Sequence, residues 1–175
     1  MLTQNINNPK LAWLPSELTP DALRINLSSD LLEELLNNRA SLNTETLSQN
    51  TIKQFPLLNA TSITVCNSHL DVGYGAFIIS GQQLTELSDA EQAATYLLIA
   101  QLLGTLQGQN QAQELIVSVR DEKQRMGQGG RYHKSNEGGE LHTDAPQYET
   151  PPNYVGLRCV RPATTGGASK LISAY

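Results

Sequence analysis

Two side chains that commonly bind metal ions, His142 and Asp144, lie two positions apart in a strand-like segment, residues 141–144. Alternate side chains of an extended strand share one face, so we expect the imidazole and the carboxylate to point the same way. The pair suits a divalent ion, and a third ligand of imidazole type would complete a facial triad that leaves open positions on Fe(II). The spacing alone also fits a solvated strand end, so both interpretations stay open.

The sequence has two other histidines, His69 and His133, and either could in principle supply a third ligand. We expect His69 in a solvated turn before a glycine-flanked strand. We expect His133 on the strand or loop that leads to His142, where it contacts substrate or lies on the surface. Residues 135–139, which include Asn136, could form part of a substrate mouth, because loops on a rigid scaffold often carry binding groups.

The elements that position these residues are predicted as helices first and strands afterwards. Residues 28–30 offer N-cap oxygens to a helix that runs to about residue 40, and Ser88 and Glu91 have the capping-box spacing of a second helix that ends at Gly104. The strand-like segments are residues 73–81, 115–119, 141–144, 154–160 and 168–172. This order suggests a mainly β fold, a β-sandwich or jelly roll with flanking helices, in which residues 73–81 are buried on both faces.

The length and net charge of the chain argue against some classes of protein. The 175 residues fit one domain, and 17 acidic against 12 basic residues give a net charge of −5. This balance argues against binding of nucleic acid or an anionic membrane by bulk charge. Cys66 and Cys159 form no zinc pattern and are expected to be free thiols. No signal peptide or membrane-spanning run is evident, so we expect a cytoplasmic location.

The second half of the chain carries a longer pattern around His142. Residues 138–174 read GGELHTDAPQYETPPNYVGLRCVRPATTGGASKLISA, with His-x-Asp, a Pro-Pro turn, an apolar strand, a Gly-Gly turn and a hydroxyl residue. In this order the segment closely resembles the clavaminate-synthase-like and taurine-dioxygenase-like branch of the iron(II)/2-oxoglutarate-dependent oxygenases. The 27 residues from His142 to Ser169 agree with that family's interval from the first iron ligand to the residue that contacts the co-substrate. The resemblance covers residues 70–175 well and the first 70 loosely.

The resemblance implies roles for individual residues. His142 and Asp144 would be iron ligands, and Ser169 would hydrogen-bond a carboxylate oxygen of 2-oxoglutarate. The family's distal His ligand, and the Arg that pairs with the distal carboxylate of 2-oxoglutarate, lie well beyond Ser169, and this chain ends before either. Arg158 and Arg161 precede Ser169, so we expect them to be solvated or salt-bridged.

The resemblance also implies a fold. We expect a double-stranded β-helix, or jelly roll, that is incomplete in this chain. Residues 1–70 would form a helical or irregular N-terminal extension, and residues 71–175 would form the first part of the oxygenase domain. Because the distal His and Arg are missing, we expect this chain alone to be inactive.

The function that follows is an oxygenase using Fe(II), 2-oxoglutarate and O2. It would couple decarboxylation of 2-oxoglutarate to succinate with hydroxylase-type oxidation of a small polar, amino-acid-like substrate. The carboxylate at Asp144 favours hydroxylation, because halogenating members have a small residue there. Two alternatives stay open: a non-catalytic jelly-roll binding or subunit protein completed by a partner chain, and a zinc-dependent hydrolase. The expected partners are a small-molecule substrate and either a second copy or a second chain with the C-terminal half, with no nucleic acid and no membrane.

Overall fold

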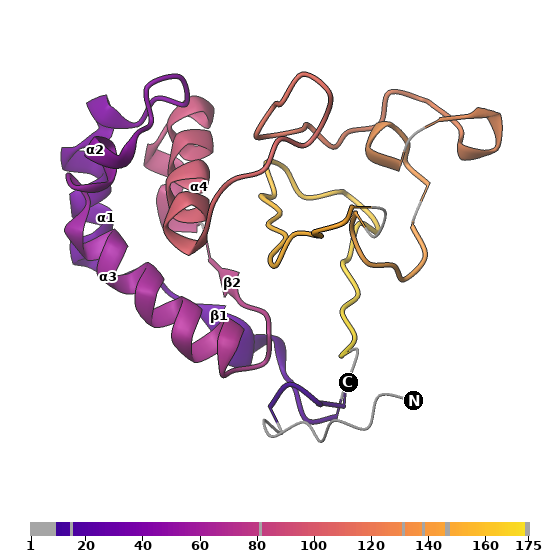
Figure 1. The fold of residues 1–175 in the computed structure, drawn as a ribbon, viewed down its shortest axis with the longest axis horizontal. Helices are drawn as coiled ribbons and strands as arrows, with labels where there is room; N and C mark the ends of the chain where they lie inside the picture. Colours follow the sequence, from indigo (N-terminus) through magenta and orange to yellow (C-terminus); the bar gives the residue numbers. More distant parts are fainter. Residues whose placement is uncertain are drawn as a thin grey trace. The chain divides into compact units, whose positions relative to one another are not determined.

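A computed structural model of the chain describes residues 10–14, 16–80, 82–130, 132–137, 139–145 and 148–173. The chain forms two compact units (Figure 1). Unit 1 comprises Met1–Thr105 with Leu171–Tyr175, and unit 2 comprises Leu106–Lys170. The expected division into residues 1–70 and 71–175 stays a prediction. No helix among the described residues has the length and apolar character needed to cross a membrane.

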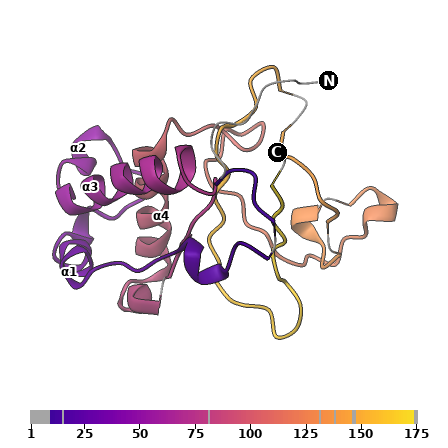
Figure 2. The same cartoon turned by 90° about the horizontal axis from the view of Figure 1, so that it is seen from below.

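The long helices of unit 1 are α1 (Ser29–Asn37), α3 (Pro56–Val65) and α4 (Asp89–Leu103). Helix α3 packs against both α1 and α4, and Figures 1 and 2 show the three helices side by side. The shorter helical segment η1 (Pro20–Leu23) precedes α1, and four others lie between the long helices: η2 (Arg39–Ser41), α2 (Gln49–Ile52), the π-helical η3 (Cys66–Asp71) and η4 (Gln82–Glu86).

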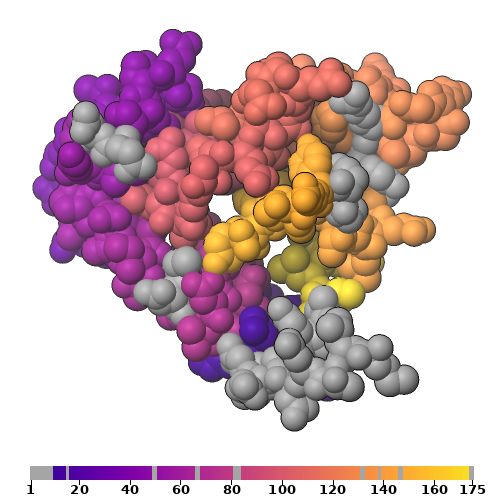
Figure 3. Space-filling view, viewed as in Figure 1, coloured from indigo at the N-terminus to yellow at the C-terminus, as the bar shows by residue number. Residues whose placement is uncertain are grey.

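The core of unit 1 is built from leucines around one aromatic ring. Phe55 is fully buried, and Leu31, Leu35, Leu58 and Leu98 are at most 2% exposed. Leu31 and Leu35 come from α1, Leu58 from α3 and Leu98 from α4, so one cluster joins the three helices. The space-filling view shows the indigo and magenta segments of unit 1 in close side-chain contact (Figure 3).

The structure confirms the two predicted helices. Helix α1 begins after Ser28, whose Oγ accepts a hydrogen bond from the backbone N–H of Leu31 at 3.2 Å. At the start of α4, Ser88 Oγ accepts from Glu91 N, and the Glu91 carboxylate accepts from Ser88 N, which completes a capping box. Gly104 follows the last turn of α4 as predicted.

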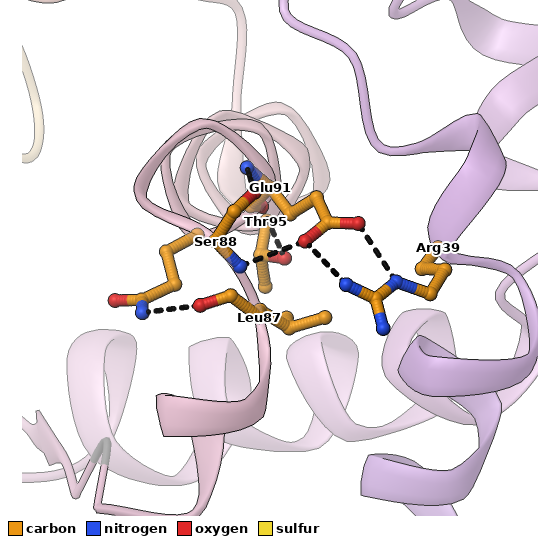
Figure 4. Close-up of polar contacts among 6 residues, drawn as sticks. Arg39, Leu87, Ser88, Glu91 and Thr95 are labelled. Atoms are coloured by element: carbon orange, nitrogen blue, oxygen red, sulfur yellow. Dashed lines mark hydrogen bonds and ion pairs between the residues drawn. The ribbon is translucent and has the colours of Figure 1, made fainter.

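An ion pair extends this capping box to a second element. Arg39 on η2 donates from Nε and Nη2 to the two carboxylate oxygens of Glu91, at 2.8 and 2.9 Å (Figure 4). These hydrogen bonds, together with those from Ser88, lower the pKa of Glu91 to about 2. The carboxylate therefore serves twice, as a cap for α4 and as an anchor for the chain after α1.

The sheet of the described chain is small. Strands β1 (Arg24–Ile25) and β2 (Ile78–Ile79) pair in parallel, with Arg24 opposite Ile78. Of the predicted strand 73–81, residue 81 lies outside the described residues, and within 73–80 the structure has the strand β2 alone. The expectation that this strand is buried on both faces is wrong, since Ile78 is 40% exposed. Gly73 and Gly75 instead form a turn next to η3.

The strands predicted at residues 115–119, 141–144, 154–160 and 168–172 are wrong for this structure, which has turns and irregular backbone there. Many of their apolar side chains are exposed, including Val119 at 67% and Leu157 at 78%. A strand needs a paired neighbour and a half-buried face, and these segments have neither among the described residues. The described chain is mostly helix and loop, so it does not confirm the mainly β jelly roll.

Candidate functional site

His142 and Asp144 face each other in unit 2. Nε2 of His142 lies 3.4 Å from Oδ1 of Asp144. Nδ1 of His142 donates a hydrogen bond to the backbone carbonyl of Glu140 at 2.6 Å, and because a carbonyl can only accept, Nδ1 carries a proton. In the neutral ring, Nε2 then presents its lone pair to the carboxylate. Two acceptors that face one another in this way are stabilised by a cation between them, either a proton on Nε2 or a metal ion.

The separation of the two donor atoms can be compared with the geometry of a metal site. With metal–ligand bonds of about 2.1 Å, two ligands at a right angle are roughly 3.0 Å apart, and two at a tetrahedral angle roughly 3.4 Å apart. The 3.4 Å between His142 Nε2 and Asp144 Oδ1 falls in this range. The His142 and Asp144 side chains are 63% and 50% exposed, so an ion can reach them from solvent. The pair therefore fits two ligands of one divalent ion.

The backbone around the pair is a turn rather than a strand. Ala145, directly after Asp144, has a φ of +50°, in the left-handed region that costs a non-glycine residue roughly 1–2 kcal/mol. Its carbonyl accepts a hydrogen bond from the backbone N–H of Tyr148 at 3.1 Å. The chain thus bends at Asp144 itself, and this bend orients the carboxylate.

A third ligand is not assembled within the described residues. They contain no group of three or more His, Cys, Asp and Glu side chains that could hold a metal ion. His69 belongs to η3 in unit 1, where Nδ1 lies 2.7 Å from Ser68 Oγ. His133 belongs to the short helix η6 (Tyr132–Lys134) in unit 2. Neither histidine joins His142 and Asp144 in such a group.

The other predicted site residues lie apart from this pair or have other partners. Ser169 is exposed, and within the described part of the chain no hydrogen bond or ion pair joins it to His142. The amide oxygen of Asn136 accepts from Arg125 Nη1 at 3.4 Å. Arg158 is half-buried and Arg161 is exposed. The roles assigned to these residues stay predictions.

The segment before the pair is closed into a loop by charged residues. The backbone N–H of Arg120 donates to the carbonyl of His133 at 2.9 Å, and Glu122 N donates to Lys134 O at 2.9 Å. The Glu122 carboxylate also pairs with Lys134 Nζ at 3.1 Å and with Arg120 Nε at 3.3 Å. Chiefly the hydrogen bond from Lys134 lowers the pKa of Glu122. His133 is thereby held by its backbone at the base of this loop.

Comparison with known families shows where the chain belongs. Residues 44–175, well over half of the chain, match the family described as taurine catabolism dioxygenase TauD, TfdA family. The chain belongs to the TauD, TfdA family. This confirms the predicted resemblance to the taurine-dioxygenase-like oxygenases, and the match begins upstream of residue 70. No curated protein and no solved structure matches the chain significantly.

Membership of the TauD, TfdA family implies a fold, a class of reaction and a set of cofactors. The family implies a jelly-roll fold, and its members are generally dioxygenases that use Fe(II), 2-oxoglutarate and O2. His142 and Asp144 lie within the matched residues. Two features of the pair were not visible in the sequence. A backbone carbonyl, such as that of Glu140, leaves no residue-type signal, and for the turn at Ala145 the sequence offered only the Pro that follows, since proline restricts the residue before it.

Proposed function

We propose that the chain is part of an Fe(II)/2-oxoglutarate-dependent oxygenase that hydroxylates a small polar, amino-acid-like substrate. Nε2 of His142 and the carboxylate of Asp144 would be two protein ligands of the iron. The observation that supports this best is the 3.4 Å approach of these two atoms, with the proton of the imidazole held on the other nitrogen. Bound iron would supply the redox chemistry that couples decarboxylation of 2-oxoglutarate to oxidation of the substrate.

The chain's own residues would contribute orientation. The carbonyl of Glu140 holds the His142 ring in the tautomer that leaves Nε2 available, as outer-shell partners of metal-binding histidines generally do. The turn at Ala145 fixes the backbone from which the Asp144 carboxylate projects. The hydroxyl of Ser169 would donate a hydrogen bond to a carboxylate oxygen of 2-oxoglutarate. A carboxylate at Asp144 occupies the position that a halide would need, which favours hydroxylation.

The substrate would be contacted from the loop that precedes the pair. His133 and Asn136 are proposed for this role, and the ion pairs of Glu122 and Arg125 hold that loop together. The amide oxygen of Asn136 is already used by Arg125, which leaves its amide N–H groups to donate to a polar substrate.

Two ligands bind iron weakly, and the described residues bring no third one to the pair. We therefore propose that a further ligand joins the pair from outside the described residues or from a second chain. The isolated chain should form no succinate from 2-oxoglutarate and Fe(II). Succinate formation by the purified chain would contradict this expectation.

Metal binding tests the site directly. Fe(II) would be titrated anaerobically into the full chain and followed by calorimetry, with Zn(II) as a second probe. His142→Ala and Asp144→Ala should each weaken Fe(II) binding by more than the roughly 10–100-fold that loss of an outer-shell partner costs. His133→Ala, a histidine in the same unit, is the matched control and should bind like the parent chain.

Each outcome of this titration decides between functions. Equal Fe(II) affinity in His142→Ala, Asp144→Ala and the parent chain would refute the proposed ligands. Loss of binding in His133→Ala would make that histidine a third ligand. Retention of Zn(II) by the pair, accompanied by hydrolytic activity, would favour the zinc-dependent hydrolase over the oxygenase.

A further inference from the structure

Three segments far apart in the sequence meet in unit 1 and enclose a cleft. The cleft has a volume of about 170 Å³ and is lined mainly by Leu11, Trp13, Tyr74, Ala76, Leu171 and Ile172. None of its lining residues is Asp, Glu, Lys, Arg or His. These residues include no candidate iron ligand, so the cleft is a feature separate from the His142 and Asp144 pair.

Two hydrogen bonds fix the frame of the cleft. The indole Nε1–H of Trp13 donates to the backbone carbonyl of Tyr74 at 3.1 Å. The hydroxyl of Ser173 donates to the backbone carbonyl of Leu11 at 2.6 Å. Both donors are used by backbone oxygens of the wall, and the surface that faces the cleft is mainly, though not entirely, apolar. Such a surface favours an apolar occupant, because a polar one would lose hydrogen bonds to water.

The turn at Gly75 shapes one side of the cleft. Gly75 has a φ of +74°, which glycine adopts freely, and its N–H donates to the carbonyl of His69 at 2.9 Å. A Cβ at Gly75 would lie 3.5 Å from Cδ2 of Leu11, within contact distance of the opposite wall. The turn therefore brings Tyr74 and Ala76 close to Leu11 without a side chain between them.

The size of the cleft limits what it can bind. An enclosed apolar cavity of about 150 Å³ in another protein binds benzene, and this cleft, which is open to solvent on one side, has a volume in which one small ring would fit. A second cavity in unit 1, lined by residues that include Ile25, Leu58 and Phe77, has only about 10 Å³ and is too small for such a ligand. Leu171 and Ile172 are 58% and 61% exposed, and a bound ring would cover part of this apolar surface.

We propose that this cleft binds a small neutral aromatic molecule, of about the size of toluene, against the indole of Trp13. Aromatic rings gain from offset or edge-to-face contact with one another, and Trp13 and Tyr74 both line the cleft. An anionic ring is disfavoured because no cation lines the walls. This binding does not depend on the proposed oxygenase chemistry, since it uses none of that site's residues.

The test uses Trp13 as its own reporter, because it is the only tryptophan of the chain. Toluene would be titrated into the full chain while Trp13 emission is recorded, with 19F line broadening of fluorobenzene as an independent measurement. Both signals should saturate. The affinity for benzoate should be lower than that for toluene by about tenfold or more. Ala76→Phe fills the cleft and should weaken toluene binding by about tenfold or more.

The controls make each result decisive. Leu157→Ala removes an exposed apolar side chain outside the cleft and should bind toluene like the parent chain. If the circular dichroism of Ala76→Phe shows that this variant does not fold, Leu171→Ala is used in its place. Its shorter side chain widens the cleft, so this variant should bind the larger ethylbenzene more tightly than toluene. A non-saturating response, equal toluene affinity in Ala76→Phe, unchanged preference in Leu171→Ala, or equal binding of benzoate would overturn the proposal.

Discussion

Replacement of Phe55 by alanine should be the most damaging single truncation in unit 1. The ring is fully buried between leucines of all three long helices. Its neighbours Leu31 and Leu98 are held by the backbones of α1 and α4, so they can move only partly into the space left behind. Truncation of a buried Phe in such a setting costs about 3–5 kcal/mol in the free energy of unfolding. Small domains have about 5–15 kcal/mol in total, so Phe55→Ala should leave unit 1 marginally stable.

Urea unfolding followed by far-ultraviolet circular dichroism measures this effect, since the described α-helices all lie in unit 1. The midpoint should fall while the dependence of stability on urea concentration stays unchanged. Leu57→Ala is the matched control: Leu57 lies on α3, two residues after Phe55, but is 45% exposed, so its truncation should change stability by only about 0.5 kcal/mol. If Phe55→Ala does not fold, Phe55→Leu should still lose more than Leu57→Ala. Equal losses at the two positions would refute the assignment of Phe55 to the core.

Two further predictions concern a carboxylate and a glycine of unit 1. Arg39 holds the pKa of Glu91 at about 2, below the ordinary 4.5, so the carboxylate's stabilising effect is present above pH 4.5 and is lost as the pH falls towards 2. Glu91→Gln should therefore lower the urea midpoint at neutral pH and much less at about pH 3, whereas an equal loss at both would refute the ion pair's role. In Gly73→Ala, the new Cβ would clash with the backbone oxygen of Ser68, which should cost about 1–3 kcal/mol by thermal or urea unfolding. Gly104→Ala meets no atom within 4 Å and should cost less; the reverse order would contradict this reasoning.

The sequence predicted the helices whose signals are local. Ser28 and Ser88 are N-caps that act within one turn, so their effect could be read without knowledge of the fold. Helix α3 was missed because β-branched residues such as Ile63 and Thr64 lower its helix propensity. Its buried residues, Leu58, Ser62 and Val65, follow helical spacing, but a serine in that stripe hides the pattern. Packing against α1 and α4 stabilises this helix, and such packing cannot be read from the segment alone.

The strands could not be predicted in the same way, because a strand is defined by its partner. Residues 154–160 and 115–119 have the composition of strands, yet among the described residues they form no ladder. Backbone hydrogen bonds in unit 2 join Arg120 and Glu122 to His133 and Lys134, and ion pairs of Glu122 reinforce them. Composition therefore indicates which segments are able to pair, while the choice of partner depends on contacts between distant parts of the chain.

Some features of the candidate site could likewise be predicted from the sequence, and others could not. Spacing in the sequence was enough to place an imidazole and a carboxylate on one side of the chain, even though a turn and not a strand brings them together. The tautomer of the neutral imidazole depends instead on the carbonyl of Glu140, an acceptor that any residue type provides. In that tautomer Nδ1 carries the proton, and the lone pair on Nε2 faces the oxygen of Asp144. In the proposed site this pair would share a metal ion, and its exposure to solvent would leave room for the further ligands that a catalytic metal requires.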